Sequence, residues 1–135
     1  MPVVLVLEDD PAVQTTLCTM LAHAGFTAHH AVTVDEALAI LRREHVDAVS
    51  LDVKVPDPKG LERSGLSLLT TLRTMPGYAK VPALIFTGMP LSFEEEDAAR
   101  KLNASIFYKP QPYSVLIQHL NRQLQPRPAP PRLDN

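Results

Sequence analysis

The chain has 135 residues and a formal charge of −2, because 15 aspartates and glutamates outnumber 13 lysines and arginines. This length and a hydrophobic content of 45% predict one domain with an ordinary core. The single cysteine, Cys18, excludes an internal disulfide framework and a zinc cluster of cysteines. The charge balance argues against a nucleic-acid-binding module. The absence of a long apolar run and of a signal peptide predicts a cytoplasmic protein without a membrane segment.

The first predicted elements are a strand and a helix. Val3–Leu7 is a continuous run of branched apolar residues, which is typical of a strand buried on both faces of a parallel sheet. Asp10 and Pro11 then suit the N-cap and the first position of a helix, and apolar residues recur at helical spacing until Gly25.

The rest of the chain repeats this alternation. Further strands are predicted at residues 26–31, 47–52, 81–87 and 104–108. Four further helices are predicted, starting at the capping box of Thr33 with Glu36, near Ser64, at the capping box of Ser92 with Glu95, and at Tyr113. Five strands, each followed by a helix, specify an α/β fold with a parallel sheet and right-handed crossovers.

Residues 126–135 are rich in proline. Because proline cannot donate a backbone hydrogen bond, we predict an extended tail or linker there, after a domain over residues 1–125. A Pro-x-x-P ligand for the aromatic groove of a partner is an alternative interpretation of the same segment.

Polar side chains are predicted at the carboxyl ends of four strands. They are Glu8 and Asp9, Asp52, Thr87, and Lys109. These ends share one edge of a parallel sheet, where ligands bind. Three neighbouring carboxylates repel one another unless a cation joins them, and Mg²⁺ prefers such oxygen ligands. A lysine and a hydroxyl can bind phosphoryl oxygens, and an aspartate can accept a phosphoryl group, so the residues predict a Mg²⁺-dependent phosphoryl site.

Four segments resemble the receiver domain of two-component response regulators. They are Leu7-Glu8-Asp9-Asp10-Pro11, Leu51-Asp52 with Pro56, Phe86-Thr87-Gly88, and Lys109-Pro110. Their order and their predicted places at strand ends match that family over about residues 2–125. The resemblance implies a flavodoxin-like (βα)5 fold, a doubly wound parallel sheet with the strand order 2-1-3-4-5.

The resemblance also implies the chemistry. Asp52 would accept a phosphoryl group from a phosphohistidine of a sensor histidine kinase or a histidine phosphotransfer protein. Asp9, Asp52 and the backbone carbonyl of Lys54 would bind Mg²⁺, with Glu8 acting largely through a metal-bound water. The chain would carry out only its own phosphorylation and dephosphorylation, and it would signal by contacting another protein.

Three further residues would contact the phosphoryl group. Lys109 would pair with its oxygens, Thr87 would turn its hydroxyl toward them, and Gly88 would leave room for the group to approach its amide. A cis peptide bond would join Lys109 to Pro110, which only a following proline makes accessible.

The chain departs from the family pattern at three places. Ile106 stands where the family commonly has an aromatic residue; Tyr108 shares its strand face and either replaces that aromatic or simply packs there. The loop 57–64 is longer than usual, and we hypothesise that it contacts a partner or shields the phosphate, a plain surface insertion being the alternative. Lys54 and Met89 offer no carboxylate or amide to orient water, so slow autodephosphorylation is expected.

Other functions compete with this switch. A receiver without phosphorylation could serve as a scaffold. An aspartyl-nucleophile phosphotransfer hydrolase is disfavoured, because such enzymes usually need an acid two residues after the nucleophile, where this chain has Lys54. A flavodoxin-like cofactor binder is disfavoured, because no glycine-rich or serine-rich phosphate loop follows the first strand. The residues name neither the kinase nor the output protein.

Overall fold

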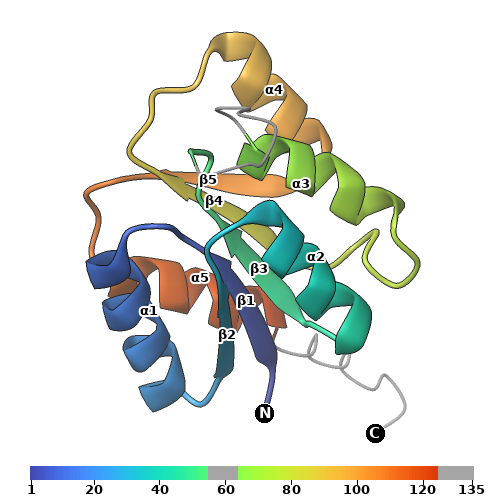
Figure 1. Cartoon of the computed structure of the whole chain (residues 1–135). Helices are drawn as coiled ribbons and strands as arrows, with labels where there is room; N and C mark the ends of the chain where they lie inside the picture. The colour runs from blue at the N-terminus through green and yellow to red at the C-terminus, as the bar shows by residue number, and fades with distance from the viewer. Residues whose placement is uncertain (55–63, 125–135) are drawn as a thin grey trace, which may run out of the picture.

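The computed structural model describes residues 1–54 and 64–124, and within them strands and helices alternate along the chain (Figure 1). The strands are β1 (Val3–Leu7), β2 (Thr27–Ala31), β3 (Ala48–Leu51), β4 (Ala83–Thr87) and β5 (Ala104–Tyr108). The helices are α1 (Pro11–His23), α2 (Val34–Arg43), α3 (Ser64–Thr74), α4 (Phe93–Lys101) and α5 (Tyr113–Leu124). The predicted tail at 126–135 and residues 57–63 of the predicted long loop lie outside the described residues.

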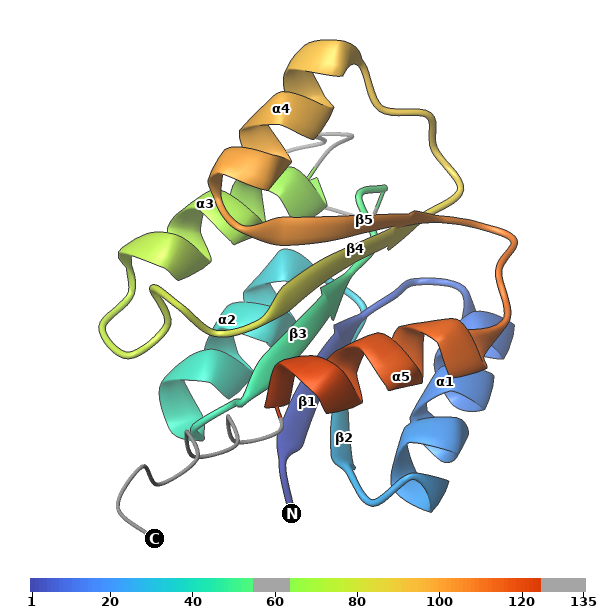
Figure 2. The same cartoon turned by 180° about the vertical axis from the view of Figure 1, so that it is seen from behind.

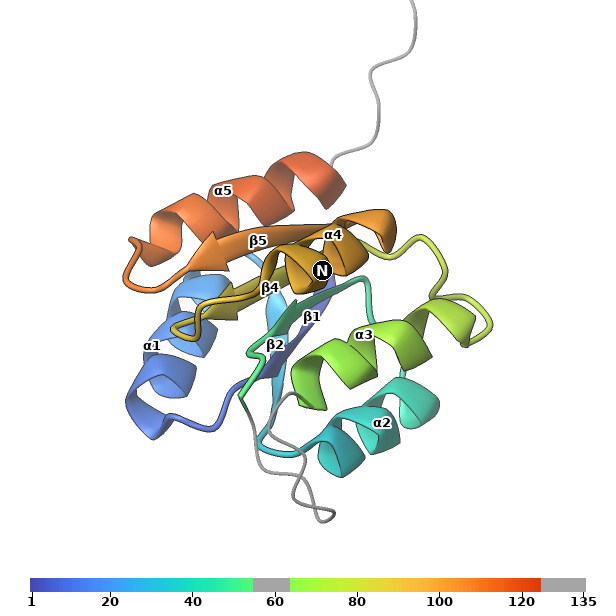
Figure 3. The same cartoon turned by 90° about the horizontal axis from the view of Figure 1, so that it is seen from above.

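The five strands form one parallel sheet in the order β2-β1-β3-β4-β5, which confirms the predicted fold and strand order. Seen from the two opposite sides, α1 and α5 cover one face of the sheet, and α2, α3 and α4 lie over the other (Figures 1 and 2). The view from above shows the sheet between these two helical layers (Figure 3). The chain passes outward from β1 to β2 and then returns past β1 to β3. The strand order therefore reverses at the carboxyl ends of β1 and β3, where such folds bind ligands.

Two apolar clusters hold the layers together, one on each face of the sheet. The cluster under α2 and α3 contains Leu5, Leu7, Val49, Leu51, Leu68, Leu69 and Leu72. The cluster under α1 and α5 contains Val4, Val6, Leu17, Leu21, Phe86, Leu116 and Leu120. Alternate residues of β1 thus enter opposite clusters, because side chains alternate along a strand. Both faces of β1 are buried, as its unbroken apolar sequence predicts.

The helix starts follow the predicted caps, with one difference. Ser92 and Glu95 form the complete capping box, in which each side chain accepts the other residue's backbone N–H. Thr33 accepts the Glu36 N–H at 3.1 Å, but the Glu36 carboxylate accepts the N–H of Val32 at 2.8 Å, one residue before the cap. The reciprocal half of the predicted box is therefore wrong, because the side chain reaches one residue further back.

At the amino ends of the strands, the guanidinium of Arg73 ties three backbone carbonyls together. Its Nε donates to the oxygen of Leu102 at 2.8 Å, just after α4. Its Nη1 donates to the oxygens of Tyr78 at 3.0 Å and Val81 at 2.6 Å, in the segment before β4. Arg73 therefore fixes the end of α4 against the start of β4.

No helix among residues 1–54 and 64–124 is long and apolar enough to cross a membrane.

Candidate functional site

The residues predicted for the site converge at the carboxyl edge of the sheet. A hollow of about 490 Å³ is lined by Glu8, Asp9, Asp52, Lys54, Thr87, Gly88 and Lys109. Each of these residues ends a strand or follows one within three positions, so the parallel sheet itself brings them together. Met89, singled out from the sequence, lines the same hollow.

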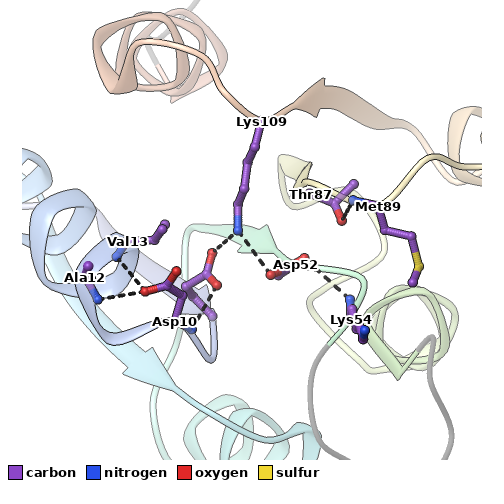
Figure 4. A network of polar contacts seen from close by, with 9 residues as sticks. Asp10, Ala12, Val13, Asp52, Lys54, Thr87, Met89 and Lys109 are labelled. Atoms are coloured by element: carbon purple, nitrogen blue, oxygen red, sulfur yellow. Dashed lines mark hydrogen bonds and ion pairs between the residues drawn. The ribbon is translucent and has the colours of Figure 1, made fainter.

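Lys109 bridges the two buried carboxylates. Its Nζ lies 2.8 Å from Glu8 Oε1 and 3.2 Å from Asp52 Oδ2. Glu8 is 2% exposed and Asp52 is 7% exposed, so water screens these pairs poorly. Figure 4 shows the extended Lys109 side chain descending from the end of β5 to Asp52. The lysine thus offsets negative charge that β1 and β3 place side by side.

The backbone and an aromatic ring hold Lys109 in this position. Its N–H donates to the carbonyl of Thr87 at 2.8 Å, which extends the pairing of β4 with β5 by one residue. Its ammonium lies 5.3 Å from the centroid of the Phe86 ring, a favourable position for a cation. The peptide bond from Lys109 to Pro110 is cis, as predicted.

Burial and the contact between Glu8 and Lys109 shift the pKa of both residues. Burial raises the pKa of Glu8 to about 7; the hydrogen bond from Lys109 opposes the rise, and the negative charge of Asp52 adds to it. Burial also acts to lower the pKa of Lys109, but the hydrogen bond to Glu8 and the charge of Asp52 outweigh it and raise that pKa. Glu8 therefore takes up a proton near neutral pH, whereas Lys109 stays charged. The repulsion predicted between the carboxylates is present, but burial contributes more.

A cation fits the three acidic residues at this edge. One carboxylate oxygen from each of Glu8, Asp9 and Asp52 lies within 4.8 Å of the others. Such oxygens are the ligands that Mg²⁺ prefers, and a bound divalent cation would relieve the cost of ionising the buried Glu8. Lys54 lies beside them; its N–H donates to Asp52 Oδ1 at 3.4 Å, and its side chain is exposed. Its backbone is therefore within reach of the cluster while its ammonium faces solvent.

The opposite wall of the hollow comes from β4 and the segment after it. Thr87 is fully buried, and its Oγ1 accepts the Met89 N–H at 3.1 Å. Figure 4 shows Asp52 lying between this pair and Asp10. A Cβ added at Gly88 would meet only the Lys109 side chain, at 3.9 Å. Thr87 and the unobstructed backbone of Gly88 thus lie across the hollow from the carboxylates.

Sequence reasoning missed Gly65, which positions Asp52. Gly65 lies in the first turn of α3, and a Cβ there would overlap the backbone carbonyl oxygen of Asp52. Its N–H also donates to the carbonyl of Val53 at 3.2 Å. Glycine lets the start of α3 approach Asp52, the residue that follows β3. The only signal in the sequence was a glycine inside an otherwise helical pattern, which costs helix stability and so suggests a packing reason.

Comparison with known proteins agrees with this geometry. The family model described as response regulator receiver domain matches residues 4–121, which include the site and all of the sheet except Val3. The chain belongs to this family. Solved receiver domains have the same fold: the chemotaxis protein CheY4 of Vibrio cholerae is 25% identical, with a TM-score of 0.79 over 92% of this chain and 99% of that one. The receiver domain of the Francisella response regulator 1452 is 26% identical, with a TM-score of 0.76 over 91% and 96%.

The curated relatives of this receiver domain match over shorter stretches. The transcriptional regulatory protein AfsQ1 of Streptomyces coelicolor is 36% identical over 62 residues, which are 46% of this chain and 28% of that protein. An uncharacterized 14.6 kDa protein of Leptolyngbya boryana is 30% identical over 97 residues, 72% of this chain and 70% of that one. The match covers only 26% to 38% of the length of three transcriptional regulators, AfsQ1 among them. The chain is thus a receiver domain of two-component signal transduction.

Proposed function

We propose that this receiver domain is a phosphorylation-activated switch in which Asp52 accepts a phosphoryl group. The observation that carries the proposal is the Lys109 ammonium shared between Glu8 and Asp52, 2.8 Å and 3.2 Å away, beside a third carboxylate from Asp9. A buried carboxylate with a cation on one side and acidic metal ligands on the other suits phosphoryl transfer. The charge of the incoming group then meets positive charge rather than three bare carboxylates.

In the proposed reaction, an oxygen of the Asp52 carboxylate attacks phosphorus in a phosphohistidine. An O–P bond forms, the P–N bond breaks, and the electron pair of that bond returns to the imidazole nitrogen. The phosphoryl group brings negative charge that the Lys109 ammonium offsets. Thr87 Oγ1 accepts the Met89 N–H in this structure; once the hydroxyl turns away from Met89, it can donate to a phosphoryl oxygen, and the Gly88 amide can donate to another.

Glu8, Asp9, Asp52 and the backbone carbonyl of Lys54 are the proposed Mg²⁺ ligands, with Glu8 acting largely through a metal-bound water. Bound Mg²⁺ would supply positive charge to the transferring group. Glu8 is the ligand whose protonation limits binding, because burial keeps its pKa near neutrality. Lys109 and bound Mg²⁺ would compete for the negative charge of Glu8 and Asp52, so the pairs of Lys109 with these carboxylates would weaken.

The proposed phosphodonor is a sensor histidine kinase or a histidine phosphotransfer protein, and the proposed output is contact with another protein or domain. Two relatives carry the name transcriptional regulatory protein, which favours an output in gene regulation. The proposed location is the cytoplasm. A hydrolase that uses Asp52 as its nucleophile gains no support, because the position two residues later holds Lys54 with its side chain in solvent.

The test is intact-mass measurement after incubation with acetyl phosphate. Wild type with Mg²⁺ should gain one phosphoryl group, and a chelator should abolish the gain. Asp52→Ala should gain nothing, whereas Asp35→Ala, which removes an exposed carboxylate in the first turn of α2, should behave as wild type. A folded wild-type protein that gains no mass and binds no beryllofluoride would overturn the proposal and favour a scaffold that works without phosphorylation.

A further inference from the structure

A second polar hollow lies at the opposite edge of the sheet from Asp52. Its volume is about 490 Å³, and its wall includes the residues that precede β4 and begin β5. Its polar lining comes from Arg73, Lys80, Arg100, Asn103, Ser105 and Gln123. No carboxylate contributes to this lining in the described part of the chain. Three cations and three neutral polar side chains therefore meet in one recess, although the chain as a whole is slightly acidic.

Arg73 is the fixed element of this hollow. Its Nε and Nη1 are held by the carbonyls of Leu102, Tyr78 and Val81, whereas Nη2 has no acceptor in residues 1–54 and 64–124. Partial burial lowers the pKa of Arg73, and no described carboxylate pairs with it. A guanidinium that is already held in place loses little conformational freedom on binding an anion.

The neighbouring cations are placed differently. Lys80 is exposed and makes no ion pair with another described residue, so its charge is available. Arg100 donates from Nη2 to Glu96 at 2.7 Å, so part of its charge is already offset. Asn103, Ser105 and Gln123 line the same hollow and bring amide and hydroxyl donors to it.

We propose that this hollow, named here the Arg73 site, binds the phosphate group of a small phosphorylated molecule. A planar guanidinium together with an ammonium and neutral donors matches the several oxygens and the double charge of a phosphate. The volume falls in the range of about 300–1,000 Å³ that is usual for small-ligand sites, so there is room for more than a bare phosphate. Six of the nine lining residues are polar or charged, which favours a polar ligand. The proposal does not depend on the chemistry of Asp52.

The test is a titration of the ¹⁵N-labelled full chain without Mg²⁺, followed by NMR at constant ionic strength. Inorganic phosphate should produce saturable shifts of the amides of Lys80, Val81 and residues 103–105. A nucleoside monophosphate in a second titration distinguishes the source of the phosphate. Tighter binding than inorganic phosphate would assign a nucleotide-like ligand, and equal binding would assign the phosphate alone. The same titration of Asp52→Ala should give the same shifts.

Two lysine variants provide the matched control. Lys80→Ala removes one cation from the Arg73 site and should weaken binding about fivefold, as expected for a charged donor near the surface. Lys101→Ala removes one cation from an exposed position paired with Asp97 and should leave the affinity unchanged. Equal weakening by both variants would show a general charge effect and overturn the proposal. Shifts that chloride reproduces, or that gather around Asp52, would also overturn it.

Discussion

The hydroxyl of Tyr108 donates a hydrogen bond to Oε1 of Glu96 at 2.9 Å and so joins β5 to α4. The other oxygen of this carboxylate accepts Arg100 Nη2 at 2.7 Å. Partial burial and then the bond to Glu96 raise the pKa of Tyr108. Ile106, two residues earlier, instead packs against the apolar cluster under α2 and α3. The aromatic residue of β5 that contacts α4 is thus Tyr108, and its replacement of the family's usual aromatic stays a prediction beside the alternative that it only packs there.

Tyr108→Phe should lower the free energy of unfolding by about 1 kcal/mol, because one hydrogen bond to a carboxylate is lost at a partly exposed position. Tyr113→Phe is the matched control, since among the described residues the Tyr113 ring contacts Phe86 while its hydroxyl has no hydrogen-bond partner. Urea unfolding of both variants measures the difference. Equal stability of the two variants would show that the bond to Glu96 contributes nothing.

Gly65→Ala should destabilise the domain by about 1–3 kcal/mol, because the new methyl group meets a backbone carbonyl that cannot move without shifting Asp52. The gain in helix propensity, at most about 1 kcal/mol, does not offset this overlap. Gly88→Ala is the control, because its methyl group would make only ordinary contacts with Lys109. Thermal unfolding distinguishes the two variants, and a Gly65→Ala protein as stable as wild type would contradict the prediction.

Mg²⁺ should bind more tightly as the pH rises from about 6 to about 8, by up to about tenfold per unit at the acid end. The direction of this pH dependence follows from the pKa of Glu8. Its pKa of about 7 in the folded protein lies above its ordinary value of 4.5, so below neutrality a proton competes with the cation. Calorimetric titration at several pH values measures the effect. Glu8→Gln has no proton to lose and should bind Mg²⁺ with little pH dependence in this range; the same slope in both proteins would refute the assignment.

The raised pKa of Glu8 also makes the stability of the metal-free protein depend on pH. Because the folded state holds the Glu8 proton more tightly than the unfolded state does, the stability that this carboxyl contributes falls as the pH rises from 4.5 to about 7. Urea midpoints measured without Mg²⁺ should therefore fall more across this range in wild type than in Glu8→Gln.

Phosphorylated wild type should lose its phosphoryl group slowly, with a half-life well beyond seconds. Neither Lys54 nor Met89, both at the wall of the hollow, carries a carboxylate or amide to orient attacking water. Lys54→Asn should shorten the half-life about tenfold or more by providing such an amide. Lys101→Asn, on the last residue of α4, should leave it unchanged. Decay of the phosphorylated mass after removal of the donor measures all three proteins, and a wild-type half-life of seconds would contradict the expectation.

The sheet and the location of the site could be predicted because both depend on local patterns. An unbroken apolar run such as Val3–Leu7 indicates a central strand, and the polar residue that follows each run must lie at one edge of a parallel sheet. Glu8, Asp52 and Lys109 could therefore be grouped before any distance was known. The capping box at Ser92 was equally local, since both of its hydrogen bonds lie within four residues.

The features that the sequence did not predict depend on contacts between distant residues. Arg73 lies in the last turn of α3, where a cation is common, yet one of its acceptors, Leu102, lies 29 residues away. The need for glycine at position 65 is clear only from the contact between the start of α3 and the Asp52 carbonyl. Lys80 lines a polar hollow only because the loop before β4 lies beside the end of α4. Neither hydrophobic periodicity nor a capping motif indicates contacts between residues so far apart in the sequence.

Tyr108 and Lys109 are consecutive residues, yet one contacts α4 and the other contacts Glu8 and Asp52. A single peptide unit thus separates the ammonium group of the reactive edge from the hydroxyl that anchors an outer helix. Under the proposed function, a displacement of the Lys109 backbone would pass directly to Tyr108. A change at Asp52 could then reach the surface of α4 through two consecutive residues, without a chain of intermediate side chains.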